Sequence, residues 1–174
     1  MPFPFLSTLF TSATEITLFD YDLISPQVQA ALPTGYQLRP LRSNDYERGF
    51  LKVLEVLTEV GHHTKEDWLD FTITITDDTT DKVVAAGTLL IERKFVHKNG
   101  VVGHIEDIAV DANQQGKKLG LRIIEALKYI GASKGCYKVI LDCAEKNIPF
   151  YEKCGFQTKE HQMAWYVPNQ KANL

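Results

Sequence analysis

The pattern of hydrophobic and polar positions changes near the middle of the chain. In the first half, apolar and polar residues alternate with a period of two, and polar turns such as residues 77–81 separate the alternating stretches. This pattern predicts antiparallel strands joined by hairpins. The strands are expected at residues 36–39, 72–76, 83–95 and 101–110.

Helical spacing interrupts this alternation. After a candidate N-cap at residues 43–45, apolar residues recur at steps of three and four, which predicts a helix that ends before Gly61. A short helix is expected at residues 65–71. A longer stripe of the same spacing, from Leu119 to Ile130, predicts a helix that opens the second half of the chain.

The second half alternates strands with helices. Residues 137–143 contain a continuous apolar run that is typical of an interior strand, and a helix at 147–153 and a last strand at 156–167 follow. This order predicts an α/β fold, a mixed and mainly antiparallel sheet with helices on both faces. Residues 1–34 show no persistent period and are predicted to be a partly mobile extension, which leaves residues 35–174 as one domain.

Composition narrows the possible functions. The chain has 174 residues, of which 44% are hydrophobic and 24% charged, as expected for a globular domain, and its net charge of −3 gives no general attraction to nucleic acid. The apolar N-terminus lacks the basic residues of a targeting sequence, because the first basic residue is Arg39, and no stretch is long enough to span a bilayer. The three cysteines and five histidines lack metal-ligand spacing. We therefore expect a cytoplasmic protein that binds no metal, nucleic acid or membrane.

The loop between the strand at 101–110 and the following helix is the most informative segment. Residues 115–120 read Gln-Gly-Lys-Lys-Leu-Gly. The start of a helix gathers unpaired N–H groups and the positive end of the helix dipole, and glycine lets a backbone approach a pyrophosphate. By itself, this loop fits either an anion site or a flexible helix entry. The Walker A and G-x-G-x-x-G patterns are absent.

Six blocks of sequence, this loop included, resemble one known family. The loop is similar to the acyl-CoA pyrophosphate pattern Q/R-x-x-G-x-G/A, with Lys118 at the place of the middle glycine. The other blocks lie, in the family's order, at residues 56–61, 92–97, 135–138, 141–143 and 147–156. Over about residues 36–165, the chain resembles the GNAT superfamily of N-acetyltransferases and, within it, the glucosamine 6-phosphate N-acetyltransferase family. The resemblance implies a GNAT fold, whose sheet has a V-shaped split between two central strands.

The resemblance also implies where acetyl-CoA lies. The V-shaped opening between the strands at 105–110 and 137–143 would hold it, and Tyr151 would protonate the departing thiolate. Backbone groups of Ile108, Ala109 and Val110 would hold the pantetheine arm and polarise the thioester carbonyl. The other cofactor-binding residues that the resemblance implies are Gln115, Gly116, Lys117, Lys118, Leu119, Gly120 and Asn147.

For the acceptor, the resemblance implies D-glucosamine 6-phosphate, acetylated for the synthesis of UDP-N-acetylglucosamine. Glu106 and Asp107 would orient the ammonium group or accept its proton, and with Tyr151 they are the expected catalytic residues. Tyr137 and Lys138 would come from a second subunit, which implies a homodimer with shared active sites. The acceptor-binding residues that the resemblance implies are Thr58, Lys94, His97, Glu106, Asp107, Tyr137, Lys138 and Asp142.

Ordinary structural roles are also open to these residues. Tyr151 can fill the core, Glu106 and Asp107 can form a solvated strand end, and Asp142 can cap a helix. Two other functions stay open as well: the same fold acting on another amine, and a non-catalytic acyl-CoA-binding regulator. The regulator is favoured if segment 68–72, which is shorter than the resemblance leads us to expect, has lost the acceptor site.

Overall fold

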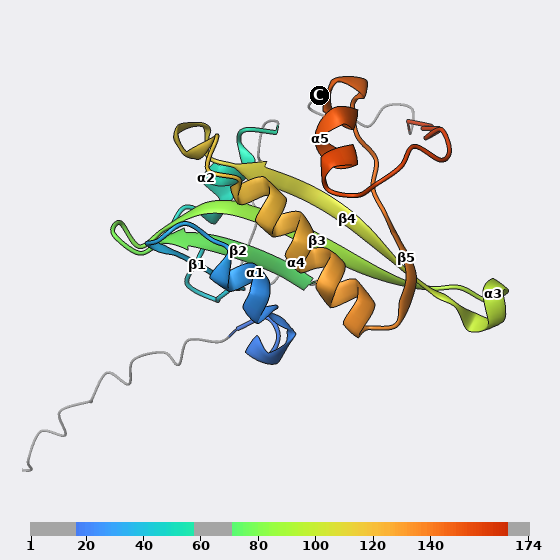
Figure 1. Ribbon diagram of the computed structural model, residues 1–174, viewed down its shortest axis with the longest axis horizontal. Coiled ribbons are helices and arrows are strands. Elements are labelled where there is room, and N and C mark those ends of the chain that lie inside the picture. The colour runs from blue at the N-terminus through green and yellow to red at the C-terminus, as the bar shows by residue number, and fades with distance from the viewer. Residues whose placement is uncertain (1–16, 58–70, 167–174) are drawn as a thin grey trace, which may run out of the picture.

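The structure is a computed structural model that describes residues 17–57 and 71–166 (Figure 1). Its strands are β1 (Tyr36–Pro40), β2 (Phe71–Asp77), β3 (Lys82–Arg93), β4 (Val101–Val110) and β5 (Cys136–Ile140). Its α-helices are α1 (Pro26–Ala30), α2 (Phe50–Leu54), α3 (Val96–Asn99), α4 (Leu119–Ser133) and α5 (Ile148–Lys153). Short 3₁₀ turns lie at η1 (Tyr21–Leu23), η3 (Ala112–Gln114) and η4 (Glu145–Asn147).

The described residues form one sheet in the order β1-β2-β3-β4-β5. The first four strands are antiparallel neighbours along the chain, as the alternation predicts, and β5 is parallel to β4. The pairing of β4 with β5 extends only from Val101 to His104, although β4 continues to Val110. The two strands therefore separate beyond His104, and this is the V-shaped split that the resemblance implies.

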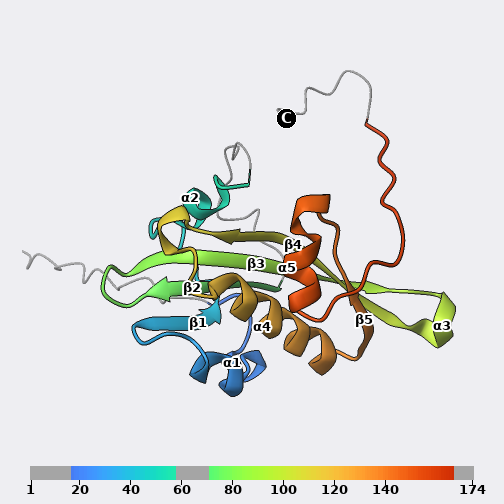
Figure 2. The same ribbon diagram turned by 45° about the horizontal axis from the view of Figure 1, so that its top comes forward.

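Helix α4 covers one face of the sheet (Figures 1 and 2). Its stripe of Ile123, Ile124, Leu127 and Ile130 is fully buried against the sheet, mainly against β3 and β4, as the spacing predicts. Burying one such side chain contributes about 1.5–3 kcal/mol, so this contact is a main source of stability. Close packing here depends on Gly87, where an added Cβ would lie 2.5 Å from Cγ2 of Ile123.

The opposite face carries α2, which is shorter than expected. A carboxylate at a helix start normally caps free N–H groups, but Asp45 instead forms a buried ion pair with Arg39 at 2.6 Å and accepts a bond from the N–H of Arg42. Gly49, with φ of 89°, is instead the N-cap residue of α2, which begins at Phe50. The N-cap predicted at residues 43–45 is thus wrong, because the buried Arg39 requires the carboxylate.

Regular structure is also present within the predicted N-terminal extension. Helix α1 begins at Pro26 behind Ser25, whose side chain accepts a bond from the N–H of Val28. Ile24 and Val28 are buried in the same core as α4. Gln29 accepts a bond from the N–H of Leu38 on the edge strand β1. The expectation of no regular element before residue 34 is wrong for α1, while the domain boundary at 34/35 stays a prediction.

Beyond α4, the structure differs from the predictions in two places. The apolar run in β5 favoured an interior strand, yet β5 is an edge of the described sheet and Ile140 is 36% exposed. Residues 156–166 form no strand, and Met163 and Trp165 are 95% and 78% exposed. Alternation orients side chains, but a strand also needs a neighbour with free N–H and C=O groups, and no described strand of this chain lies beside this segment.

Some predictions fall outside the described residues. Thr58 lies there, as does the short helix expected at 65–71, except for the residue that begins β2. Among the described helices, none combines the length and apolar character that crossing a membrane requires.

Candidate active site

The separation of β5 from β4 leaves part of β4 with an open edge. From Ile105 to Val110, β4 pairs with β3 on one side only. The ladder is irregular here, because Thr88 pairs with Glu106 and Ala86 pairs with Ala109, so β4 holds one extra residue. Such bulges re-aim backbone groups and recur beside active sites. The N–H and C=O groups along this edge can therefore bind an extended ligand chain, as a further strand would.

The start of α4 lies at one end of this open edge. Gly116 has φ of 81°, and Lys118, the N-cap residue, has φ of 61°. Lys118 thus adopts the left-handed conformation that glycine would adopt without strain. No side chain caps α4, so the N–H groups of its first turn lack acceptors within the helix and can bind an anion.

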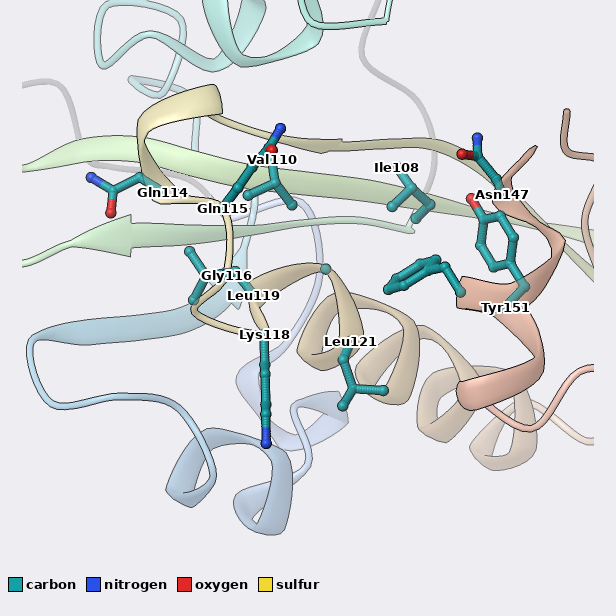
Figure 3. A pocket seen from close by; sticks show the side chains of 12 residues that line it. Ile108, Val110, Gln114, Gln115, Gly116, Lys118, Leu119, Leu121, Asn147 and Tyr151 are labelled. Carbon is teal, nitrogen blue, oxygen red and sulfur yellow. The ribbon is translucent and has the colours of Figure 1, made fainter.

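The side chains of the two lysines of the loop differ in their contacts. Lys117 donates to the hydroxyl of Tyr36 on β1 at 2.6 Å, and this hydroxyl donates to Gln114 at 2.8 Å. Its ammonium also lies 5.2 Å from the centre of the Tyr36 ring. The side chain of Lys117 is therefore fixed on β1, while Lys118 is exposed at the cleft rim (Figure 3).

A cleft of about 530 Å³ follows these features, a size suited to a small-molecule ligand. Figure 3 shows the 114–119 loop at one end of the cleft and Asn147 with Tyr151 at the other. The lining residues are Ile108, Val110, Gln114, Gln115, Gly116, Lys118, Leu119, Gly120, Leu121, Asn147, Phe150 and Tyr151. Of the predicted cofactor-binding residues, Ala109 and Lys117 do not line it: the side chain of Ala109 is buried in the α2 face. Gln114, Leu121 and Phe150 were not predicted, since nothing in their residue type marks them.

Tyr151 projects from α5 toward the cleft (Figure 3). Its ring packs edge-on against Phe150 and Phe156, at 5.1 and 6.3 Å between centroids. Burial raises the pKa of the Tyr151 hydroxyl, with smaller contributions from the thiols of Cys143 and Cys154. The phenol therefore stays protonated at neutral pH and can donate a proton within the cleft.

Three of the predicted acceptor residues lie together near the bulge of β4. The pKa of Glu106 is raised, first by burial and then by the negative charges of Asp107 and Asp142. Asp107, with φ of 55°, occupies the bulge itself. A carboxylate whose pKa is raised by its neighbours is suited to accept a proton or to bind a cation such as an ammonium group.

Four further predicted acceptor residues lie at or beside α3, at the far end of the β3–β4 hairpin (Figures 1 and 2): Lys94, His97, Tyr137 and Lys138. The rings of His97 and Tyr137 lie 5.2 Å apart, and the ammonium of Lys138 lies 5.9 Å from the centre of the Tyr137 ring. Lys94 pairs with Glu92 at 2.5 Å. Within one chain, this cationic group lies away from the start of α4.

Among the described residues, no group of three His, Cys, Asp or Glu side chains is placed to hold a metal ion. The expectation of a metal-free site stays a prediction.

An open strand edge, an uncapped helix start and a tyrosine in the same cleft suit an enzyme that transfers an acyl group from acyl-CoA. The family model described as acetyltransferase (GNAT) family matches residues 36–156. The chain therefore belongs to the GNAT family, which uses acetyl-CoA, and within it to the glucosamine 6-phosphate N-acetyltransferases, as its relatives establish.

These relatives match over most of their length. The chain is 45% identical over 146 residues to glucosamine 6-phosphate N-acetyltransferase 1 of Dictyostelium discoideum, covering 77% of this chain and 92% of that protein. It is 42% identical over 137 residues to the enzyme of Candida albicans, covering 72% and 92%. The crystal structure of the Arabidopsis thaliana enzyme superposes with a TM-score of 0.70 at 38% identity, covering 75% of this chain and 97% of that one. The GNAT fold expected from the sequence is thereby confirmed.

Proposed function

We propose that this chain transfers the acetyl group of acetyl-CoA to the amine of D-glucosamine 6-phosphate. The observation that carries the proposal is its identity of 38–45% with relatives that bear this name, over about three quarters of the chain. The site supports it, because the cleft offers a place for a CoA thioester and carboxylates for an ammonium group lie beside it.

Each part of the cleft has a chemical task in this reaction. The first turn of α4 and the loop around Gly116 bind the pyrophosphate through N–H groups. The open edge of β4 near Ile108 binds the pantetheine arm and supplies a donor to the developing oxyanion, an interaction that contributes about 3–4 kcal/mol. Glu106 and Asp107 orient the amine and take up its proton, and Tyr151 protonates the sulfur of the leaving thiolate.

We further propose that the enzyme is a homodimer with shared active sites. The cations and aromatic rings near α3, which suit a sugar phosphate, lie away from the cleft of their own chain. Phe95 beside them is fully exposed, and β5 has an open edge. A second copy would bring Tyr137 and Lys138 to the acceptor end of the cleft. The product would serve the synthesis of UDP-N-acetylglucosamine in the cytoplasm.

The release of free thiol from acetyl-CoA, measured with a panel of amines, tests this function. Glucosamine 6-phosphate is expected to react at least about tenfold more efficiently than glucosamine, because hydrogen bonds to charged groups contribute about 1.5–3 kcal/mol. Equal rates with both sugars would exclude the sugar-phosphate assignment and favour another amine. Binding of acetyl-CoA without thiol release for any amine would favour a regulator.

A further inference from the structure

Tyr36, the first residue of the edge strand β1, has no role in the proposed function so far. Its hydroxyl accepts a hydrogen bond from Nζ of Lys117 at 2.6 Å and donates one to Oε1 of Gln114 at 2.8 Å. Nζ of Lys117 also donates to Oε1 of Gln114, so the three side chains form a closed triangle of hydrogen bonds. We call Tyr36, Gln114 and Lys117 the loop clamp, because Tyr36 holds two residues of the loop before α4.

The loop clamp joins the two sides of the turn that contains Gly116. Gln114 comes before Gln115 and Gly116 in the chain, and Lys117 follows them. Gly116 has φ of 81° and Lys118 has φ of 61°, and a lysine adopts this left-handed conformation only where its surroundings hold it there. The start of α4 has no side-chain cap, so the bonds of the clamp help to fix the loop that leads into it.

The segment before β1 holds Tyr36 in turn. Nε2 of Gln29 on α1 donates to the carbonyl of Tyr36 at 3.4 Å, and Oε1 of Gln29 accepts a bond from the N–H of Leu38 at 2.7 Å. A second link joins the same segment to α4, since Nε of Arg122 donates to the carbonyl of Ala31 at 3.1 Å. The backbone of Tyr36 and the beginning of α4 are therefore fixed to one common support.

We propose that Tyr36 is a positioning residue for acetyl-CoA: through Gln114 and Lys117 it holds the loop so that the N–H groups there and in the first turn of α4 stay directed at the pyrophosphate. Donors that are already held in their bound geometry lose less conformational freedom on binding, so the affinity is higher. Tyr36 itself does not line the cleft and acts through the loop. The place of the pyrophosphate rests on the proposed function, whereas the identity of the acceptor does not enter.

The first test measures the binding of acetyl-CoA by calorimetry, without an acceptor. Tyr36→Phe keeps the ring and removes the hydroxyl at the centre of the clamp. Its Kd is expected to rise about three- to tenfold, which is the net effect of losing one hydrogen bond. Tyr129→Phe is the matched control, because it removes a hydroxyl near the other end of α4 and should leave the Kd unchanged. A native Kd in folded Tyr36→Phe overturns the proposal.

The second test identifies the part of the cofactor that Tyr36 serves. S-Acetylpantetheine is an acetyl donor that lacks the pyrophosphate and the nucleotide. With glucosamine 6-phosphate as acceptor, Tyr36→Phe is expected to raise the KM for acetyl-CoA and to leave kcat unchanged. Its kcat/KM for S-acetylpantetheine should stay native, because this donor does not reach the loop. A general structural defect would impair both donors alike, and that result would contradict the proposal.

Lys117→Met tests whether Tyr36 acts through the clamp. It removes the ammonium and keeps a side chain of similar length, and Lys117 is exposed, so the fold should not depend on it. In the Lys117→Met background, Tyr36→Phe is expected to raise the Kd by less than it does alone, since the two residues share one set of bonds. Independent effects would contradict the proposal. So would a native Kd in Lys117→Met, and this result counts even if Tyr36→Phe does not fold.

These measurements separate this inference from the proposed function. If glucosamine 6-phosphate is not the acceptor, the native protein shows no turnover with it, while calorimetry still decides the role of Tyr36. If the native protein binds acetyl-CoA no more tightly than S-acetylpantetheine, the loop does not bind the pyrophosphate, and both proposals are wrong. If the native protein prefers acetyl-CoA and Tyr36→Phe keeps that preference in full, only the role of Tyr36 is wrong.

Discussion

Tyr151 combines a half-buried ring with a hydroxyl that faces the cleft. Tyr151→Phe keeps the packing against Phe150 and Phe156 and removes the proton. Because loss of a general acid costs about 10²–10⁴ in rate, turnover is expected to fall by that factor while affinity for acetyl-CoA hardly changes. Single-turnover kinetics and calorimetry measure the two quantities separately. A phenylalanine variant with native single-turnover rates would return Tyr151 to a role in packing.

The ionisation of Glu106 is expected to make the stability of the protein depend on pH. Burial and the neighbouring carboxylates raise its pKa, so its ionised form disfavours the folded state. This penalty is present above the folded pKa and disappears at pH values where Glu106 is protonated both folded and unfolded. Glu106→Gln is therefore expected to raise Tm at neutral pH and not at strongly acidic pH, and to lower turnover by about 10²–10⁴-fold. Thermal melts across pH check the first effect, and a Tm gain that is independent of pH would contradict it.

For single residues, the sequence could predict which residues are chemically suited to the site, but it could not predict where their side chains lie. The glycine-bearing loop carries a recognisable chemistry, whereas the role of Tyr151 was predicted only from the family resemblance, because a tyrosine alone also fits a role in packing. Tyr151 and residues of the loop line the same cleft. The sequence did not predict that the side chain of Lys117 donates to the hydroxyl of Tyr36, 81 positions earlier in the chain. Contacts of this sequence separation depend on the folded sheet. The predicted place of Lys117 in the pyrophosphate loop stays a prediction. Leu121 and Phe150 line the cleft by position alone.

Among the elements, α4 and β3 set the dimensions of the site. An added Cβ at Gly87 on β3 would lie 2.5 Å from Ile123 of α4 and 2.6 Å from Ile108 of β4. Gly87→Ala should therefore push the helix from the sheet, at a cost of about 1–3 kcal/mol for overpacking. Because Ile108 lines the cleft, affinity for acetyl-CoA should fall as well. Urea denaturation and calorimetry measure these two effects.

Gly120, in the first turn of α4, provides the matched control for stability. An added Cβ there would meet Phe150 and Val110 at 3.4 and 3.5 Å, which is close to ordinary contact. Alanine also has a higher helix propensity than glycine, by about 1 kcal/mol. Gly120→Ala is thus expected to retain or raise the free energy of unfolding. If the Gly87→Ala protein were as stable as the Gly120→Ala protein, the prediction that α4 packs too closely on β3 to admit a side chain at residue 87 would be wrong.

The sequence predicted well those helices and strands whose form depends on residues close to them in the chain. The β2–β3 hairpin and α4 follow from alternation and from a three- and four-residue stripe, and both are confirmed. The predictions of an interior position for β5 and of a strand over the described residues 156–166 were wrong, because both depended on a neighbouring strand. An apolar run shows that a segment prefers burial, but it does not show which surface will bury it.

At the scale of the whole molecule, the residues predicted to form the site lie in two groups. The cleft, with Tyr151 and the carboxylates around Glu106, lies where β4 and β5 separate. The rings and cations of His97, Tyr137 and Lys138 lie near α3, at the other end of β5. One chain thus presents the two groups of predicted acceptor residues at different positions along β4 and β5. In a dimer, each cleft would be completed by the partner's group near α3.

Mixing two inactive variants tests whether the sites are shared. In a hybrid dimer of a Lys138→Ala subunit and a Tyr151→Phe subunit, one site would receive its native Lys138 from the partner and keep its own Tyr151. Random reassociation should then restore about a quarter of the native sites, since half of the dimers are hybrid and each contains one intact site of two. Each variant mixed with itself is the control and should stay inactive. If Lys138 served its own chain, no hybrid site would be intact, and the mixture would be as inactive as its components.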